Sequence, residues 1–375
     1  MRAASSPCSE ARTPECAGGA RGLESSSCRP ARPRRIFAKA PAGAVSRKRP
    51  LPRQTPICRT NFPPKIAEKK FARPPDLWEY RPEMDCFLID GFNLGFRCFY
   101  AMPDLSRSDG FPTGALHAFF QSLLRLSAMD APHAGAVFFD KGGSARHREI
   151  FPEYKANREE TPESFKRQLP AIRDLCGLFG YETVSQEGVE ADDLLASTVE
   201  KLKPLGGTIT VVSADKDFAQ LVCPRVRQLL PPNSRDKNWT PLDPIGVKSK
   251  FGVPPAQIPA FLAIVGDSAD NIPGIPGAGP KTAAKWLKDY GDIDAIIRRH
   301  DWLKPEKFRA VIRESEALLR RNLELVTLKT DFEVELPSQK APDFPELVKF
   351  LEEMEMKKSL VNLRKFAKDF YKIDL

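Results

Sequence analysis

From residue 85 onward, short apolar runs alternate with longer amphipathic stretches. Four runs of apolar and β-branched residues predict buried strands, at 86–90, 134–139, 208–212 and 226–230. Apolar residues at helical spacing between them predict helices, most clearly at 113–129, at 169–179 and after Glu190. Because strands alternate with helices, the pattern predicts an α/β fold with a parallel sheet flanked by helices. After Pro241 the pattern becomes helical, with one extended segment near 332–336.

Residues 1 to 80 have no such periodicity and are rich in Arg, Ala, Ser and Pro. Such a composition buries too little apolar surface to fold, so we expect a disordered basic extension. An N-terminus that is rich in Arg and Ser and poor in acids is typical of a transit peptide. We therefore expect a plastid or mitochondrial location. A disordered arm that binds nucleic acid is the alternative.

The net charge of +9 belongs to this extension. Residues 1–82 contain 18 lysines and arginines and 6 acidic residues, whereas the remaining residues contain 40 and 43. The positive charge is therefore no evidence that the folded part binds nucleic acid. No apolar run reaches the roughly 18 residues of a membrane helix, so we expect no membrane partner. The eight cysteines form no C-x-x-C pair, which argues against a disulfide framework or a zinc site.

Acidic residues follow three of the predicted strands. Asp90 and Asp140 each end one strand, and Asp215 and Asp217 follow another. A buried strand end normally avoids a charge, and the carboxyl ends of strands are where open α/β sheets bind ligands. Further acids lie at the start of a predicted helix and in a later loop: Glu190, Asp192, Asp193, Asp267 and Asp270.

A set of carboxylates without histidine partners predicts a hard divalent cation, Mg²⁺ or Mn²⁺. Two such ions suit in-line displacement at phosphorus, where one activates water and the other stabilises the leaving oxygen. Without these nine acids, the charge of residues 83–375 changes from −3 to +6, which suits a polyanionic substrate. For residues 188–217 taken alone, two unrelated solvated acidic patches are the alternative.

Residues 141–168 form a basic insert between the second strand and the next helix. Arg146, Lys155 and Arg158 alternate there with Phe151 and Tyr154. This pattern is typical of a surface on which the bases of a single strand stack. A solvated charged loop is the alternative.

A glycine-rich turn precedes a helix near residue 280. Gly277 and Gly279 expose backbone N–H groups that a phosphate can approach, and Lys281 and Lys285 follow. Together they predict a hairpin that holds a nucleic-acid backbone without reading its sequence. Without the lysines, an ordinary turn would be the better interpretation.

Five motifs in order carry a family resemblance: Leu-Ile-Asp90-Gly, Phe-Phe-Asp140-Lys, Glu190-Ala-Asp192-Asp193, Ala-Asp215-Lys-Asp217 and Gly-Asp267-Ser-Ala-Asp270-Asn. Residues 84–375 resemble the 5′→3′ exonuclease domain of bacterial DNA polymerase I, the phage 5′-nucleases and the flap endonucleases. The resemblance implies a PIN-like α/β domain at 84–240 with a helical arch at 141–168. It also implies a C-terminal helical region at 241–375 with a helix–hairpin–helix at 266–290.

The resemblance assigns the acids to two metal clusters. The first would contain Asp90, Asp140, Glu190, Asp192 and Asp193, and the second Asp215, Asp217, Asp267 and Asp270. Lys155 and Arg158, in a Tyr-Lys-x-x-Arg pattern, and Arg97 would act on the scissile phosphate. Tyr154 and Arg146 would contact DNA, and Gly277, Gly279, Lys281 and Lys285 would hold the duplex, with K⁺ bound at the turn carbonyls.

Two departures from the family, Phe218 in place of Leu and Phe92 within the first motif, involve no ligand. We predict a stand-alone, monomeric, two-metal 5′→3′ exonuclease and flap endonuclease. Its partner would be DNA with 5′ ends, flaps or nicks, in organellar replication or repair. A non-catalytic protein that binds DNA junctions is one alternative. A ribonuclease of the related acid-cluster class is another, although the insert and the hairpin argue against it.

Overall fold

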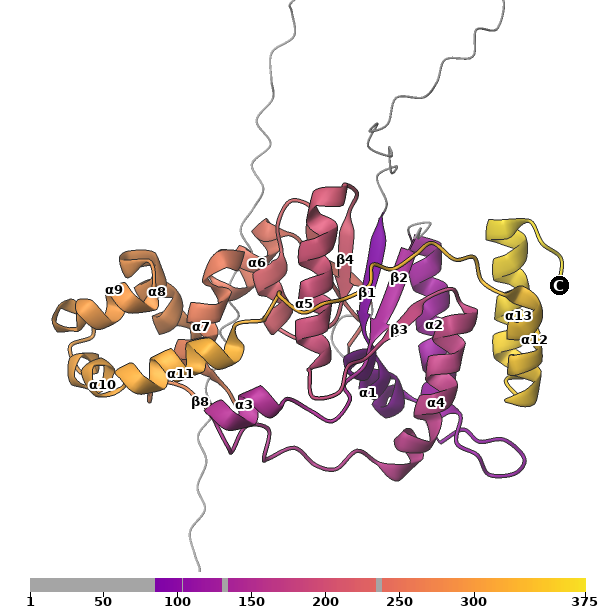
Figure 1. Cartoon of the computed structure of the whole chain (residues 1–375), viewed down its shortest axis with the longest axis horizontal. Coiled ribbons are helices and arrows are strands. Elements are labelled where there is room, and N and C mark those ends of the chain that lie inside the picture. The colour runs from indigo at the N-terminus through magenta and orange to yellow at the C-terminus, as the bar shows by residue number, and fades with distance from the viewer. Residues whose placement is uncertain (1–84, 103, 130–133, 234–237) are drawn as a thin grey trace, which may run out of the picture. The chain divides into compact units, whose positions relative to one another are not determined.

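The structure is a computed structural model that describes residues 85–102, 104–129, 134–233 and 238–375 (Figure 1). The predictions for residues 1–80 lie outside the described residues. None of the described helices is both long and apolar enough to cross a membrane. Cys86, Cys98 and Cys176 are buried free thiols, as expected of reduced core cysteines.

A six-stranded sheet forms the centre of the α/β part, in the order β3-β2-β1-β4-β5-β6. Its strands are β1 (Cys86–Asp90), β2 (Ala134–Phe138), β3 (Glu182–Val184), β4 (Ile209–Val212), β5 (Val226–Leu230) and β6 (Thr240–Leu242). The first five are parallel, and β6 runs antiparallel to β5. The four predicted strands are confirmed. The two short edge strands, β3 and β6, were not predicted.

Helices connect these strands and cover both faces of the sheet. They are α1 (Gly91–Ala101), α2 (Gly114–Met129), α3 (Ala145–Ile150), α4 (Glu163–Leu178) and α5 (Ala191–Leu202), with short 3₁₀ turns η1 (Lys203–Leu205) and η2 (Asp217–Leu221). In β1, Phe87 and Ile89 pack into the core formed with α1, α2 and α4. Cys86 and Leu88 pack into the opposite core, formed with α5. Because both faces are covered, the strand is apolar throughout instead of alternating.

After β6 the chain is mainly helical. Its elements are α6 (Pro244–Phe251), η3 (Pro255–Gln257), α7 (Ile258–Val265), β7 (Gly266–Asp267), β8 (Ile272–Pro273), α8 (Pro280–Tyr290), α9 (Ile293–Arg298), η4 (His300–Trp302), α10 (Phe308–Glu314) and α11 (Glu316–Val326). These elements share a core of their own around Ile264, Trp286 and Leu319. The range 266–290, predicted as a helix–hairpin–helix, contains the β7–β8 hairpin, the turn with Gly277 and Gly279, and α8.

The last helices pack on the α/β part of the chain. After α11 an extended segment, 327–343, runs past α5 and leads to α12 (Phe344–Glu353), α13 (Lys357–Phe366) and a π-helical turn, η5 (Ala367–Tyr371) (Figure 1). Leu347, Leu351 and Leu363 are fully buried in the core formed with α2 and α4. Within the predicted helical region 241–375, the apolar faces of these last helices therefore pack on the α/β part, whereas the preceding helices share the core around Ile264.

Candidate metal centre

Hydrogen bonds hold the acids at the carboxyl ends of β1, β2 and β4. Asp90 is the last residue of β1 and accepts hydrogen bonds from the Asn93 N–H at 3.0 Å and the Ser213 hydroxyl at 2.9 Å. Asp140 follows β2 and accepts one from the Ala191 N–H at 2.7 Å, at the start of α5. Because β1 lies between β2 and β4, these contacts bring the ends of the three strands together, as the sequence predicted.

Two more of the predicted acids, Asp192 and Asp215, line one open cavity of about 1120 Å³ together with Asp90 and Asp140. We call these four residues the first acid group. Burial and the charges of Asp215 and Asp140 raise the pKa of Asp90 to about 7, although its hydrogen bonds act in the opposite direction. Burial and the charges of Asp90 and Asp215 also raise the pKa of Asp192 well above its usual value. Burial and mutual repulsion therefore disfavour the ionised carboxylates of this group, and a bound cation would relieve both.

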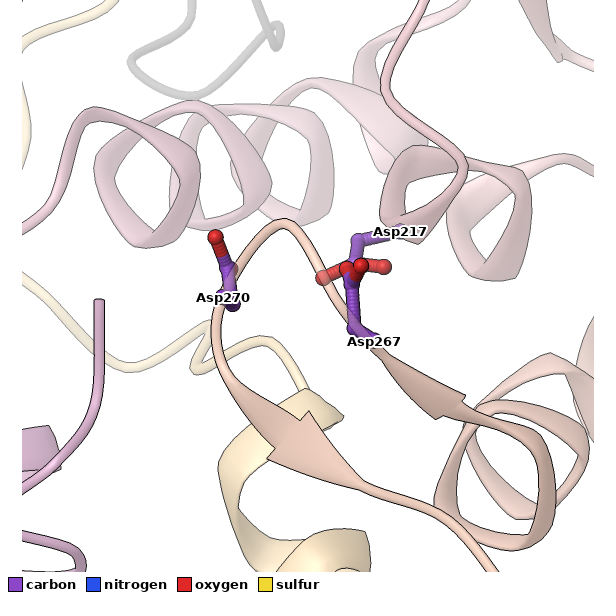
Figure 2. Close-up of side chains that lie close together, drawn as sticks. All are labelled: Asp217, Asp267 and Asp270. Atoms are coloured by element: carbon purple, nitrogen blue, oxygen red, sulfur yellow. The ribbon is translucent and has the colours of Figure 1, made fainter. Parts of the chain in front are cut away.

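Three further acids form the second acid group: Asp217, Asp267 and Asp270 (Figure 2). Asp217 begins η2, and the other two lie on the β7–β8 hairpin. One carboxylate oxygen of each lies within 4.8 Å of the others. Asp217 Oδ1 is buried and has no hydrogen-bond partner. Burial, followed by the charge of Asp215, raises the pKa of Asp217 well above its usual value.

Two glycines let the β7–β8 hairpin close tightly enough to present Asp267 and Asp270. Gly266 has a φ of +79°, a backbone conformation that residues with a side chain rarely adopt. A Cβ on Gly274 would lie 2.1 Å from the Val265 carbonyl oxygen. Any larger residue at either position would therefore displace the hairpin that carries the two acids.

The residues of the second acid group fit a hard divalent cation. Their donors are all carboxylate oxygens, which Mg²⁺ and Mn²⁺ prefer to softer ligands. The three oxygens lie within 4.8 Å of one another, so small adjustments of the carboxylates would let one ion reach all three at about 2.1 to 2.5 Å. A buried carboxylate oxygen without a partner, such as Asp217 Oδ1, is costly unless a cation satisfies it.

The base of the predicted arch lies against this hairpin. The Lys155 N–H donates to the Asp270 carbonyl at 3.0 Å, and Asn157 Nδ2 donates to the Ser268 carbonyl at 2.8 Å. In return, Asn271 Nδ2 donates to the Glu153 carbonyl at 2.8 Å. Backbone contacts therefore fix the arch base beside the second acid group.

Three cationic side chains reach the acids. Lys155 Nζ lies 2.7 Å from Glu190 Oε1, and Arg158 forms an ion pair with Asp270. Lys216 Nζ, which the sequence reasoning missed, lies 2.9 Å from Asp267 Oδ1. Burial would lower the pKa of Lys155, but the charges of Glu190 and Asp270 outweigh it and raise the pKa. Lys155 and Arg158 therefore lie beside the acids.

Tyr154 differs from its prediction as a base-stacking residue. Its side chain is buried, and its ring stacks on His147 with centroids 4.7 Å apart. Because the ring is covered, no base can stack on it. Its hydroxyl lies instead 3.2 Å from Glu190 Oε2 and 3.3 Å from Asp270 Oδ2.

Arg146 and Asp193 also lie elsewhere than predicted. Arg146 Nη2 donates to the Glu324 carbonyl at 3.2 Å, so its guanidinium faces α11. Asp193 Oδ1 accepts the Lys329 N–H at 2.8 Å, at the extended segment that follows α11. Both side chains therefore stabilise contacts with α11 and the segment after it, whereas the neighbouring Asp192 faces the cavity.

The other predicted residues line the cavity, lie in the turn before α8 or lie on α8. Arg97 lines the cavity and donates to the Pro232 carbonyl at 3.3 Å. Gly277, with a φ of +76°, and Gly279 are exposed in the turn before α8. Lys281 and Lys285 are exposed one turn apart on α8. The sequence reasoning also missed Ser213 and Gln228, which hold the segment before Asp215 through hydrogen bonds to Asp90 and to backbone carbonyls.

Two family models match adjoining parts of the chain. Residues 85–252 match the N-terminal resolvase-like domain of 5′-3′ exonucleases, and residues 253–345 match the C-terminal SAM fold of 5′-3′ exonucleases. The boundary between the two models falls at the end of α6. The acids of the first group and Asp217 lie in the first match, and Asp267 and Asp270 lie in the second.

Similar proteins include a 5′-3′ exonuclease of Aquifex aeolicus, 38% identical over 284 residues that cover 74% of this chain and 95% of the relative. The thermostable DNA polymerase I of Thermus thermophilus is 38% identical over 279 residues, which cover 74% of this chain but only 33% of the polymerase. Among solved structures, the bacteriophage T5 5′-exonuclease with bound zinc matches with a TM-score of 0.57 and 26% identity. That match covers 77% of this chain and 99% of the phage protein.

Proposed function

The chain belongs to the 5′-3′ exonuclease family, and from this premise we propose that it is a metal-dependent nuclease that removes nucleotides from DNA 5′ ends and cuts 5′ flaps. One observation carries the proposal. Two groups of buried and half-buried carboxylates, which interact through the charge of Asp215, lie beside a basic arch base. Such a site has little use other than to hold cations against a phosphate.

Two divalent ions, when bound, would supply an activated water and balance the charge on the leaving oxygen. The chain's own residues hold and orient what reacts. Hydrogen bonds from Asn93, Ser213 and Ala191 fix the Asp90 and Asp140 carboxylates. Lys155 and Arg158 remain protonated beside the acids, where they can bind a phosphate as its charge grows.

The proposed identity of the metal ion rests on the chemistry of its ligand atoms. We propose Mg²⁺ or Mn²⁺ because every donor is a carboxylate oxygen. The exposed Gly277–Gly279 turn, followed by Lys281 and Lys285, suits the backbone of a DNA duplex and K⁺ at its carbonyls. We propose a monomer, because one chain supplies both acid groups, the arch base and the hairpin.

The deciding experiment is a labelled 5′-flap substrate incubated with the protein with and without Mg²⁺. We expect a 5′ cleavage product only with Mg²⁺, and a loss of at least about 100-fold for Asp217→Asn with duplex binding retained. A protein that only binds junctions would give a shifted band and no product in either condition. That result would overturn the nuclease assignment.

The same assay separates DNA from RNA substrates. We expect flaps with a DNA 5′ strand to be cut, and the comparison uses matched RNA and hybrid strands. Cleavage restricted to RNA would instead identify a ribonuclease.

The role proposed for Lys155 is tested by single-turnover kinetics of Lys155→Ala. We expect a slower chemical step with Mg²⁺ saturating, by about 10²-fold, because a cation beside the developing charge is lost. The exposed Lys349, on α12, gives the matched control Lys349→Ala. An unchanged single-turnover rate would remove Lys155 from the reacting site.

We propose that the protein acts in organellar DNA replication or repair, on the basis of the Arg-rich, Ser-rich residues 1–80. A fusion of these residues to a fluorescent protein tests the location. Fluorescence confined to plastids or mitochondria would support it, whereas a diffuse cytosolic signal would contradict it.

A further inference from the structure

We propose that His147 is a positioning residue that holds the Tyr154 hydroxyl between the two acid groups, and so helps to set how they bind their two cations. The inference rests on the proposed function, because it concerns the same site. His147 lies on α3, in the first leg of the arch, and only 3% of it is exposed. Neither the sequence motifs nor the proposed mechanism gave this side chain a role.

Both ring nitrogens of His147 have partners that fix the ring. Nε2 lies 3.2 Å from the Leu325 carbonyl, which can only accept, so Nε2 carries a proton. Nδ1 lies 2.6 Å from Ser144 Oγ, whose hydroxyl can donate to it. Ser144 Oγ also accepts the His147 N–H at 3.1 Å. The imidazole is therefore held from the start of α3 on one side and from the end of α11 on the other.

The fixed imidazole supports Tyr154 through its face. The two rings stack with centroids 4.7 Å apart and planes at 21°. A buried phenol that packs on an immobile ring has little freedom to rotate away. A phenol with an ordinary pKa of about 10 carries its proton at neutral pH, so the hydroxyl is a donor.

The Tyr154 hydroxyl lies at the boundary between the acid groups. It is 3.2 Å from Glu190 Oε2, at the start of α5 beside the first group, and 3.3 Å from Asp270 Oδ2 of the second. A phenol has one proton, so the two carboxylates share it. Such a contact orients both carboxylates relative to each other, and hydrogen bonds of this kind typically contribute 10- to 100-fold in metal affinity.

His147 also connects the pieces that must come together in the site. It contacts the carbonyl of Leu325 on α11, and Asn322, one turn earlier, donates to the carbonyls of Ala263 and Pro273 that flank the β7–β8 hairpin. The arch leg, the helical region and the acids of the hairpin are therefore linked through neighbouring contacts. A mere packing role for His147 would affect folding stability but not metal affinity.

The test measures Mn²⁺ binding by the full chain without DNA, from the electron paramagnetic resonance signal of free Mn²⁺. The variants are Tyr154→Phe, which removes only the hydroxyl, His147→Phe, which keeps a flat ring but loses both ring hydrogen bonds, and the double variant. His300→Gln, at a histidine far along the chain in η4, is the matched control. Thermal unfolding of each variant establishes that it is folded.

We expect Tyr154→Phe to weaken Mn²⁺ binding by about tenfold or more and His147→Phe by a similar factor. If His147 acts through the hydroxyl, the double variant should bind Mn²⁺ as tightly as the single variant with the larger loss of affinity. The second change then removes nothing further. If His147→Phe does not fold, His147→Gln, which keeps a donor for the Leu325 carbonyl, replaces it. The loss of Mn²⁺ affinity in His147→Gln should be smaller than that in Tyr154→Phe.

The proposal would be overturned if Tyr154→Phe bound Mn²⁺ with an affinity within twofold of wild type. It would also be overturned if the loss of Mn²⁺ affinity in the double variant equalled the product of the losses in the two single variants. A wild-type chain that binds no Mn²⁺ would instead contradict the proposed function. The two failures are therefore distinguishable.

Discussion

Asp217 combines burial, like-charged neighbours and an oxygen without a hydrogen-bond partner. Each of these raises the free energy of the folded state when no cation is present. A site that must bind two divalent ions accepts this cost, because the same features make ion binding favourable. Stability and function therefore oppose each other at this residue.

In metal-free protein, Asp217→Asn should raise the thermal midpoint. The substitution removes a buried charge that Asp215 and Asp270 repel, and a gain on the order of 1 kcal/mol corresponds to roughly 2 °C. Added Mn²⁺ should stabilise the wild-type chain more than the variant. Asp369→Asn, at an exposed position in η5, is the control. A lower midpoint for Asp217→Asn without metal would contradict this account of the site.

At the residue scale, the sequence predicted acids whose position follows from a strand end and missed what depends on distant contacts. Asp90 and Asp140 could be predicted because a buried strand must end near a ligand site to tolerate a charge. The sequence could not show which of Asp192 and Asp193 faces the cavity. Neighbours on a helix point about 100° apart, and the sequence does not orient the helix. The base-stacking role predicted for Tyr154 was wrong because the ring of His147 covers it, a contact that exists only in the folded chain.

Among the elements, the β7–β8 hairpin has little freedom to change. Its two strands have two residues each, so the close approach of Gly266 and Gly274 sets the position of both acids. Asn271, at the other end of the loop, adopts a φ of +60° and bonds to the arch base. The geometry of the second acid group therefore depends on backbone conformation as much as on its carboxylates.

Gly274→Ala should destabilise the chain by about 1–3 kcal/mol and weaken Mn²⁺ binding, because the new Cβ would overlap the Val265 carbonyl oxygen. Denaturant unfolding measures the first effect, and Mn²⁺ titration measures the second. Gly279→Ala is the matched control for stability, since a Cβ there meets nothing within 4 Å and its φ is −84°. Equal stability of the two variants would show that the hairpin tolerates a wider spacing.

The contact between α2 and α13 should depend on pH. His117 Nδ1 lies 2.8 Å from Ser359 Oγ, and burial, followed by the charge of Lys358, lowers the pKa of His117 below 6.5. Below that value the unfolded chain takes up the proton more readily than the folded chain. The contribution of His117 to stability is therefore present above 6.5 and is lost as the pH falls through the folded pKa.

The measurement is the free energy of unfolding of wild type and His117→Gln from about pH 7 to about pH 5. Wild type should lose more stability than the variant over this range. Parallel curves for wild type and His117→Gln would rule out a pH-dependent contact here.

The strands were predictable where burial on both faces made them uniformly apolar, as in β1 and β4. The edge strands were not, because β3 has three residues that are only partly buried or exposed and β6 contains a proline. These strands form through pairing with β2 and β5, which no local pattern reveals.

For the molecule as a whole, the matches to the family models end at residue 345, yet the core does not. Helices α12 and α13 complete the apolar layer over α2 and α4. Their amphipathic patterns predicted a buried face but not its partner, because periodicity says nothing of what an element packs against. The predicted helical region 241–375 therefore contains helices that join two different cores.

Leu351→Ala should lower the free energy of unfolding by about 2–5 kcal/mol, because Leu351 is fully buried in the core beneath α12. Val361→Ala, at a residue 64% exposed on α13, should change it by less than about 0.5 kcal/mol. Chemical denaturation provides both values. A small effect of Leu351→Ala would show that α12 docks only loosely.

The route of the segment 327–343, which returns the chain from the helical region to the α/β part, also affects how the protein is made. A ribosome releases the chain from its N-terminus, and domains generally fold in that order. Here the layer over α2 and α4 lacks Leu347, Leu351 and Leu363 until α12 and α13 have been translated. The outer apolar faces of α2 and α4 are thus made early but stay uncovered while the whole helical region between them and α12 is synthesised.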